Sequence, residues 1–215
     1  MKLYYSPGAC SLSPHITFRE AGLPVTLVKA STKTHQLDDG TDYFSINPKG
    51  YVPLLELDNG ERLTEGPAIV QYLADRNPAA GLAPAAGTME RYRLHEWLNF
   101  ITAELHKQFS PLFAATTPAE YKELLKEKIG KRFDFVAGRL QGKDYLMGKQ
   151  FTVADPYLYT ILRWSAVVGI DLAKWPALTA YKARVEARPK VQEALAAEGL
   201  VKQTAKAANA QRRMS

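Results

Sequence analysis

KLYYSPGACS, residues 2–11, joins a short apolar strand to the start of a helix and carries the only cysteine of the 215-residue chain, Cys10. A thiol at a helix N-terminus faces unsatisfied backbone N–H groups and the positive end of the helix dipole, which stabilise the thiolate. We therefore expect Cys10 to have a lowered pKa and to be reactive. The alternative is that Cys10 is a small buried apolar residue, as free cysteines commonly are.

Residues 1–80 alternate between strand and helix patterns. Gly22 is typical of a helix C-cap, and Asp58-Asn-Gly60 is typical of a hairpin turn. The order βαβ followed by ββα predicts a small mixed sheet covered by helices. The predicted strands are residues 2–5, 25–29, 52–57 and 61–64, and the predicted helices run from about Ser11 to Ala21 and from Pro67 to about Arg76.

The rest of the chain has a helical pattern. Residues 81–88 are rich in Ala, Pro and Gly and predict a linker, whereas residues 89–200 repeat apolar side chains at helical spacing. Thr152-Val-Ala-Asp155 is a capping box, in which Asp155 would accept a hydrogen bond from the amide at the helix start. We expect an α+β protein of two domains, the second all-α. Its predicted helices are residues 89–113 as one long amphipathic helix, 118–140, a helix from Thr152, 176–187 and 191–198.

The positive charge is concentrated at the end of the chain. The net charge is +6, and residues 201–215 hold four Lys and Arg with no acid, so we expect a frayed basic tail and no nucleic-acid partner. No apolar run approaches the roughly 18 residues of a membrane span, and the N-terminus lacks a signal-peptide pattern. A single cysteine fits a reducing compartment. The sequence therefore predicts a cytoplasmic protein without a membrane contact.

Two helix N-termini in the first domain are candidate anion sites. At the first, a thiolate of the protein or of a small ligand would lie near Cys10, with the hydroxyl and amide of Ser11 as further donors. At the second, the amides near Gly66 suit a carboxylate, and Glu65 beside them suits an ammonium group. Together these features match the head group of an α-amino acid. The alternative for Glu65 is a solvated loop carboxylate.

Two further segments are candidates for ligand contacts. A cis bond between Val52 and Pro53 would leave the backbone of Val52 free to pair with an extended peptide. On the predicted helix 89–113, Asn99, Ala103 and His106 fall on one face. There His106 could donate to a thiolate or move a proton, the alternative being a solvent-exposed polar face. No metal site is expected, because one cysteine and four histidines show no ligand spacing.

A set of motifs in one order resembles the cysteine-containing beta class of bacterial glutathione transferases over about the first 200 residues. The opening run, residues 1–15, is similar to that class nearly residue for residue. The resemblance implies a thioredoxin-like domain joined to an all-helical domain, a homodimer, and glutathione as co-substrate. The other motifs are Asn47-Pro-Lys-Gly-Tyr-Val-Pro53, Leu63-Thr-Glu-Gly-Pro-Ala-Ile69, Trp97-Leu-Asn99 with Glu104-Leu-His106, and Thr152-Val-Ala-Asp155.

The resemblance also implies roles for single residues. Cys10 would lie against the glutathione sulfur and could form a mixed disulfide with it. The backbone of Val52, before a cis-Pro53, would pair with the cysteinyl part of the tripeptide. The remaining implied contacts are Glu65 and Gly66 at the γ-glutamyl end, and Asn99, Ala103, Glu104 and His106 close to the sulfur from the helical domain.

Two positions depart from the pattern of these relatives. His35, with Lys33 two residues earlier, stands where relatives commonly carry Lys for the glycyl carboxylate, so the affinity for glutathione could be lower or pH-dependent. Gly66 stands where many transferases have Ser, which leaves only the backbone amide for the γ-glutamyl carboxylate.

Three functional hypotheses follow. The leading one is a transferase that conjugates the glutathione thiolate to hydrophobic electrophiles in detoxification, with Cys10, Ser11 and His106 stabilising the thiolate. The second is a glutathione-dependent thiol transferase, peroxidase or reductive dehalogenase that uses Cys10 through a mixed disulfide. The third is a non-catalytic carrier of hydrophobic ligands. Candidates for an apolar substrate pocket between the domains are Phe109, Phe113, Tyr157 and Trp164, although aromatic residues are more often plain core.

Overall fold

A four-stranded mixed sheet forms the first part of the molecule. The computed structural model describes residues 1–201, and in it the strand order is β2-β1-β3-β4, with β2 parallel to β1 and the other neighbours antiparallel. Leu3 lies opposite Leu27 on one side and Leu55 on the other. The strands are β1 (Lys2–Tyr5), β2 (Thr26–Lys29), β3 (Leu54–Glu56) and β4 (Arg62–Thr64).

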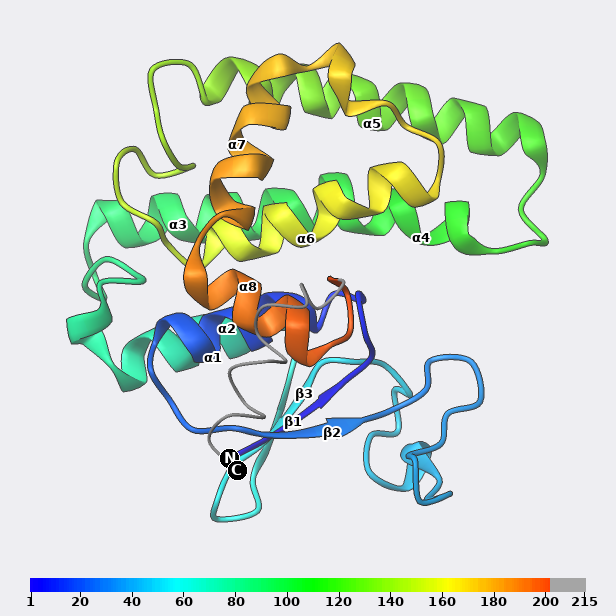
Figure 1. The fold of residues 1–215 in the computed structure, drawn as a ribbon, viewed down its shortest axis with the longest axis vertical. Helices are drawn as coiled ribbons and strands as arrows, with labels where there is room; N and C mark the ends of the chain where they lie inside the picture. Colours follow the sequence, from blue (N-terminus) through cyan, green and yellow to red (C-terminus); the bar gives the residue numbers. More distant parts are fainter. Residues whose placement is uncertain (202–215) are drawn as a thin grey trace, which may run out of the picture.

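Each face of the sheet has its own apolar cluster, because successive strand residues point to opposite faces. Leu3 and Leu55 face α1 (Leu12–Glu20) and α2 (Gly66–Arg76), which supply Phe18, Ile69 and Leu73 to the same cluster. The other face packs the loop that contains the short helix η1 (Tyr43–Ser45) against Tyr4 and Leu54. Figure 1 shows α1 and α2 between the sheet and the helical region.

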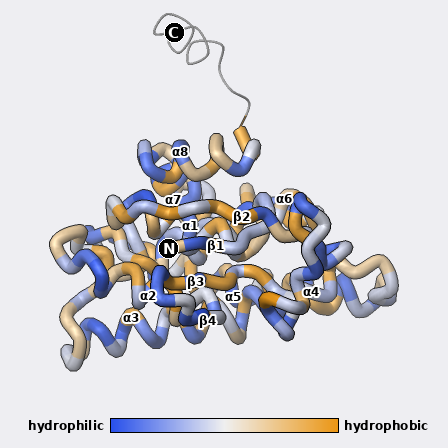
Figure 2. The backbone as a smooth tube through the Cα atoms, turned by 90° about the horizontal axis from the view of Figure 1, so that it is seen from below, coloured by the Kyte–Doolittle hydropathy of each residue, from blue (hydrophilic) through white to orange (hydrophobic). Residues whose placement is uncertain are grey.

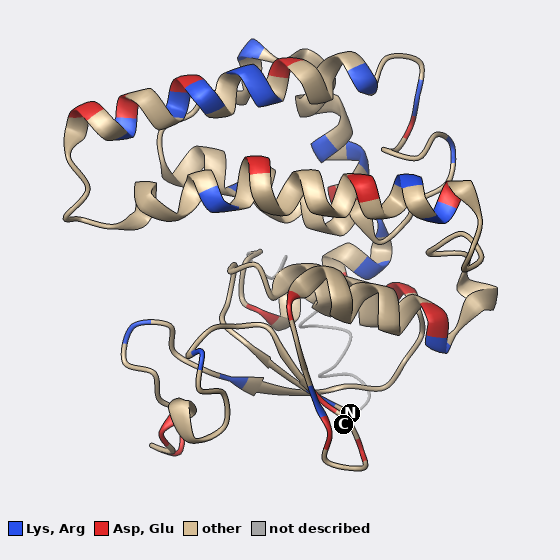
Figure 3. Cartoon of the chain, turned by 180° about the vertical axis from the view of Figure 1, so that it is seen from behind, with Lys and Arg blue, Asp and Glu red and all other residues tan. Residues whose placement is uncertain are grey.

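The helical region packs around α6 (Ala154–Val167), most of whose residues are buried. In Figure 2, β3 is coloured as one of the hydrophobic stretches of the sheet, whereas Figure 3 shows charges of both signs along the outer helix α5. No helix among residues 1–201 is long and apolar enough to cross a membrane. The other elements are η2 (Pro78–Ala80), α3 (Met89–Phe100), η3 (Ile101–His106), α4 (Lys107–Phe113), α5 (Ala119–Arg139), η4 (Leu172–Lys174), α7 (Pro176–Glu186) and α8 (Pro189–Ala197).

The long helix predicted over residues 89–113 is interrupted, and this corrects the sequence prediction. η3 is a π-helical segment, in which the amide of Lys107 donates to the carbonyl of Thr102, five residues earlier. A π turn holds one extra residue and rotates the following side chains relative to an α-helix. His106 therefore turns towards the sheet domain instead of sharing a face with Asn99 and Ala103, which are exposed.

The capping box at residues 152–155 is confirmed, and its carboxylate also binds groups outside the helix start. Asp155 is fully buried, and its Oδ2 accepts the amide of Thr152 at 2.7 Å. Oδ1 accepts the amide of Leu146 at 2.9 Å and the hydroxyl of Tyr181 at 2.8 Å. The helix itself begins at Ala154, two residues later than predicted. Asp155 therefore joins the start of α6 to the preceding loop and to α7.

The end of the described chain holds the β1–α1 loop in place. The carboxylate of Glu198, which is fully buried, lies 2.9 Å from Nδ1 of His15 and accepts the amide of Gly8 at 2.8 Å. Trp164 on α6 donates from Nε1 to the carbonyl of Gly8 at 2.9 Å. The predicted basic tail, residues 201–215, lies outside the described residues apart from Val201. The loop that carries Cys10 is thus fixed by residues far away in the sequence.

Residues 81–88, predicted as a linker, contain no helix or strand. Leu82 within them is nevertheless buried in the main apolar cluster, and its carbonyl accepts the amide of Val153 at 2.9 Å. The connection is therefore packed against the helical region.

Candidate active site

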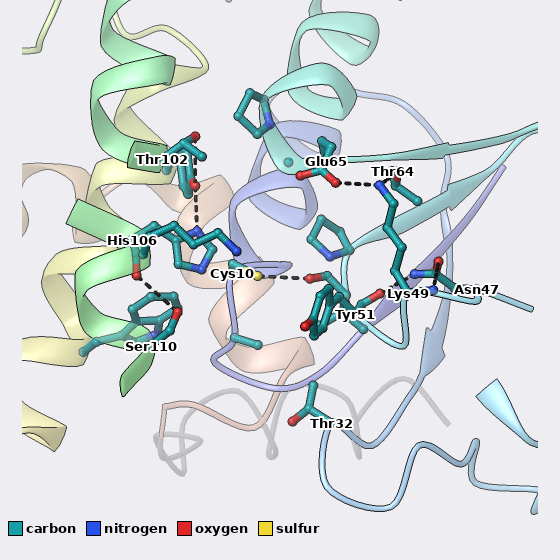
Figure 4. A pocket seen from close by; sticks show the side chains of 18 of the residues that line it. Cys10, Thr32, Asn47, Lys49, Tyr51, Thr64, Glu65, Thr102, His106 and Ser110 are labelled. Carbon is teal, nitrogen blue, oxygen red and sulfur yellow. Dashed lines mark hydrogen bonds and ion pairs between the residues drawn. The ribbon is translucent and has the colours of Figure 1, made fainter. Parts of the chain in front are cut away.

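A pocket of about 490 Å³ lies between the sheet domain and the helical region. Figure 4 shows Cys10 facing His106 across it, with Glu65 and Lys49 at its sheet-domain end. The sheet-domain wall consists of Ala9, Cys10, Thr32, Asn47, Lys49, Tyr51, Val52, Pro53, Thr64, Glu65, Gly66 and Pro67, and the helical wall of Thr102, His106, Lys107, Ser110, Phe113, Tyr157 and Trp164.

Cys10 lies just before α1, and its Sγ donates to the carbonyl of Val52 at 3.1 Å. Burial raises the pKa of the Cys10 thiol to about 11, although the backbone N–H groups of Cys10 and Ser11 act in the opposite direction. Desolvation disfavours a charged form more than two partial charges favour it here. The expected lowering of the Cys10 pKa is therefore wrong, and Cys10 is a neutral thiol in this structure.

Ser11 is fully buried and does not line the pocket. Its hydroxyl donates to the carbonyl of Ser6 at 3.2 Å and accepts the amide of Ser6 at 3.1 Å. Only the backbone N–H of Ser11 acts on the sulfur of Cys10. The hydroxyl predicted to stabilise a thiolate instead closes the β1–α1 loop on itself.

The peptide bond between Val52 and Pro53 is cis. The loop before it is held by the carbonyl of Tyr51, which accepts the Asn47 side-chain amide at 2.7 Å and the Tyr43 hydroxyl at 3.0 Å. The Val52 carbonyl is thereby presented to Cys10.

Glu65 and Gly66 stand at the N-terminus of α2, as predicted. Glu65 has a φ of 71°, a left-handed conformation that side chains other than Gly rarely adopt. Its carboxylate accepts the ammonium group of Lys49 at 2.8 Å, and Lys49 also donates to the Thr64 hydroxyl at 3.0 Å. Glu65 therefore binds an ammonium group, here that of Lys49.

His35 and Lys33 do not line the pocket. The His35 ring packs against Phe44 with 4.5 Å between ring centroids, and its Nδ1 lies 3.2 Å from the carbonyl of Gly50. Lys33 is exposed on the same loop. The positively charged group that this wall brings to the pocket is Lys49, which sequence reasoning missed although it lies in the motif Asn47-Pro-Lys-Gly-Tyr-Val-Pro53.

His106 projects from the end of η3, and its Nδ1 lies 2.7 Å from the hydroxyl of Tyr157. Burial lowers the pKa of His106 to about 4, and the charge of Lys107 acts in the same direction. Trp164 lies edge-on to the ring, with 5.0 Å between centroids. His106 is thus a neutral imidazole at pH 7.

The four aromatic candidates separate into two groups. Phe113, Tyr157 and Trp164 line the pocket. Phe109 is fully buried in the core between Phe133 and Trp164 and does not reach the pocket. The alternative reading of a plain core aromatic is the right one for Phe109.

Asn99, Ala103 and Glu104 lie on the outer side of this wall and do not line the pocket of their own chain. The side-chain amide of Asn99 donates to the carbonyl of His95 at 3.0 Å, and Glu104 accepts Nε of Arg132 at 2.7 Å. The π segment turns Thr102 and His106 towards the pocket, so that these two residues line it. Thr102 lies four residues before His106, and this helical spacing would have indicated it as a neighbour of His106 in the pocket wall. No group of three or more His, Cys, Asp and Glu that could hold a metal ion occurs within residues 1–201.

Comparisons with known proteins agree with this architecture. The chain matches "Glutathione S-transferase, N-terminal domain" over residues 8–76 and "Glutathione S-transferase, C-terminal domain" over residues 100–189. It is 48% identical over 200 residues to glutathione S-transferase GstA of Escherichia coli O157:H7, which covers 93% of this chain and 100% of that protein.

Two solved structures are similarly close. One is a sphingomonad glutathione S-transferase in complex with glutathione, at 49% identity and a TM-score of 0.90, covering 94% of this chain and 100% of that one. The other is the bacterial beta-class enzyme of Sphingomonas chungbukensis, at 47% identity and a TM-score of 0.91, with the same coverage. On this evidence the chain belongs to the glutathione S-transferase family, close to its bacterial beta class.

Proposed function

We propose that the protein binds glutathione in this pocket and conjugates its thiolate to hydrophobic electrophiles. The observation that carries the proposal is that one pocket joins a polar wall, with Glu65 and Gly66 at a helix start and Cys10 beside Val52, to an aromatic wall from the helical region. A peptide thiol needs the first wall, and an apolar second substrate needs the other.

The polar wall suggests how the tripeptide lies. The α-carboxylate of the γ-glutamyl group fits the amide of Gly66 at the start of α2. Its ammonium group fits Glu65, where it would replace the Lys49 ammonium. The cysteinyl backbone would pair with Val52, which brings the ligand sulfur to Cys10 and His106.

Catalysis requires the thiol to lose its proton. The thiolate sulfur then bonds to the electrophilic carbon, and the leaving group departs with its electron pair. Phe113, Tyr157 and Trp164 offer the electrophile an apolar surface beside the sulfur. The backbone amides around Cys10, the charge of Lys107 and the neutral imidazole of His106 are groups available to favour the thiolate.

Calorimetry with reduced glutathione under reducing conditions tests the binding step. We expect one site per chain, weaker binding by Glu65→Gln, and unchanged binding by Glu61→Gln, an exposed carboxylate that contacts Asn59. Turnover of a nitro-activated aryl chloride, followed by absorbance, tests the conjugation step. Absence of binding heat with the native protein would contradict the whole proposal, and binding without turnover of any electrophile would indicate a ligand carrier.

A second candidate function is favoured by the position of Cys10 in the pocket. Its thiolate could attack the glutathione sulfur of a disulfide between glutathione and another thiol, forming a mixed disulfide with glutathione and releasing that other thiol. A glutathione thiolate would then attack the mixed disulfide, restoring Cys10 and releasing glutathione disulfide. The same mixed disulfide would serve a peroxidase or a reductive dehalogenase. The pKa of about 11 disfavours Cys10 as the nucleophile. Conjugation that survives in Cys10→Ala, together with loss of the mixed disulfide in mass spectra, would make Cys10 a redox partner only.

We also propose that the chain forms a homodimer. Met89, Tyr92 and Phe135 on α3 and α5 are 64%, 58% and 48% exposed, which leaves large apolar side chains open to a second copy. Light scattering should give twice the chain mass of 23.9 kDa, and a monomer mass would contradict the proposal. A free Cys10 thiol supports a cytoplasmic location, because reducing compartments preserve such thiols.

A further inference from the structure

A chain of part-buried hydroxyl groups leads from the helix backbone to His106. The Thr102 hydroxyl lies 2.8 Å from the carbonyl of Leu98. The Tyr157 hydroxyl lies 3.3 Å from the Thr102 oxygen and 2.7 Å from Nδ1 of His106. Each hydroxyl carries one proton, so the direction of the chain follows from where each proton must be.

The first proton is fixed by the carbonyl of Leu98. A carbonyl oxygen only accepts, so the Thr102 hydroxyl must donate to it. Towards Tyr157, the Thr102 oxygen is then an acceptor. Burial raises the pKa of Tyr157, so its hydroxyl stays protonated and has one proton to place.

Tyr157 can place that proton in two directions. If it donates to His106, the contact between Tyr157 and Thr102 holds no proton, and the lone pairs of the two oxygens face each other at 3.3 Å. If it donates to Thr102, then Nδ1 of His106 must carry a hydrogen and donate to Tyr157, and every contact in the chain is a hydrogen bond. Buried polar groups are overwhelmingly paired, and aligned chains strengthen each bond. The second arrangement is the one the structure favours.

The other ring nitrogen of His106 is open. Among residues 1–201, Nε2 has no hydrogen-bond partner, and it is not one of the buried polar atoms that lack one. Figure 4 shows the ring on the wall opposite Cys10, so Nε2 is accessible from the pocket. We propose that Thr102 and Tyr157 are positioning residues that hold His106 as the Nδ1–H tautomer, so that an unprotonated Nε2 faces the glutathione sulfur.

This inference rests on the proposed function for its catalytic meaning. The glutathione S–H bond would break with its proton passing to Nε2 and its electron pair staying on sulfur. The imidazolium then donates from Nδ1 to Tyr157, whose oxygen is already orientated to accept. The neighbouring thiolate stabilises that cation, which opposes the lowering of the His106 pKa by burial. His106 therefore accepts the thiol proton, whereas the Nε2–H tautomer could only donate to the sulfur.

Nuclear magnetic resonance of histidine-labelled protein tests the tautomer without glutathione. Long-range ¹H–¹⁵N correlations distinguish a protonated from an unprotonated ring nitrogen, and His106→Gln identifies the signal. We expect Nδ1–H in the native protein at pH 7. Thr102→Val should change His106 to the Nε2–H form although Thr102 does not touch the ring, because the Tyr157 proton then turns to Nδ1. Tyr157→Phe should also lose the Nδ1–H form.

Tyr159→Phe is the matched control, since it removes a buried hydroxyl that contacts Arg163 and not the pocket; it should keep the Nδ1–H form. In conjugation assays, Thr102→Val and Tyr157→Phe should lower kcat about tenfold while leaving KM for glutathione nearly unchanged. An Nε2–H tautomer in the native protein, or a tautomer unchanged by Thr102→Val, would overturn the inference. Failure of glutathione to bind would instead defeat the proposed function and leave the tautomer result standing.

Discussion

The two walls of the pocket differ in how they are built. The sheet-domain wall consists of short local motifs, such as the turn before Pro53 and the start of α2, and its charged side chains are Lys49 and Glu65. The helical wall consists of side chains from η3, α4 and α6, which meet only through tertiary packing. Local motifs therefore define most of the first wall, although Glu198 and Trp164 also hold its Cys10 loop. The second wall depends on how separate helices pack together.

The largest expected effect is a loss of stability in the helical region, where Asp155 joins α6 to the preceding loop and to α7. Asp155→Ala leaves the amides of Thr152 and Leu146 buried without an acceptor. It also removes the shorter of the two hydrogen bonds of the Tyr181 hydroxyl, which keeps only the backbone carbonyl of residue 155 at 3.3 Å. We expect it to lower the free energy of unfolding by about 4 kcal/mol, since each orphaned buried donor costs 1–3 kcal/mol. Urea denaturation measures this loss. Asp171→Ala is the control, because it removes only the cap of η4, and it should cost about 1 kcal/mol of unfolding free energy. Equal losses in the two variants would contradict the role of Asp155 in joining α6 to the preceding loop and to α7.

Sequence reasoning succeeded where structure is local. The strands, the turn at residues 58–60 and the Asp155 cap were predicted from neighbouring residues, whereas the cis bond was implied by the family resemblance. It failed on the pKa of Cys10, which burial by the whole fold decides, and on the long helix 89–113, because a π turn leaves the apolar spacing nearly unchanged. Lys49 was missed because nothing in one sequence shows which exposed polar residue faces a cleft. Thr102 was missed although its position four residues before His106 on a helix places it beside that residue.

A second effect tests the contacts of Glu198 that join the Cys10 loop to the helical region. Glu198→Ala removes the acceptor for His15 and for the amide of Gly8 in the loop that carries Cys10. We expect a loss of about 3 kcal/mol in unfolding free energy, from two buried groups left unpaired. Hydrogen exchange should show faster exchange in residues 6–12. Unchanged exchange in that loop would mean that Trp164 and the hydrogen bonds between Ser6 and Ser11 hold it without Glu198.

A third effect is the pH dependence of stability that His106, in the helical wall, contributes. The pKa of His106 is about 4 in the folded protein against 6.5 for an ordinary histidine. Between these values the unfolded chain binds more protons, so the His106 contribution makes stability rise with pH and fall as the solution becomes acid. We expect the native protein to lose about 2 kcal/mol relative to His106→Asn between pH 6.5 and pH 4. A difference independent of pH would contradict the buried, neutral histidine.

The smallest effect tests the polar wall. Gly66→Ser adds a hydroxyl at the start of α2, and a Cβ there meets no atom within 4 Å, so the unfolding free energy should change by less than about 0.5 kcal/mol. The new donor lies beside the site proposed for the γ-glutamyl carboxylate, and one added hydrogen bond should tighten glutathione binding about threefold to tenfold in calorimetry. Gly66→Ala separates the hydroxyl from the loss of backbone freedom, because it adds only the Cβ. Equal affinities for the Ser and Ala variants would place the carboxylate elsewhere, and the polar wall would then need a different reading of which end of the tripeptide it holds.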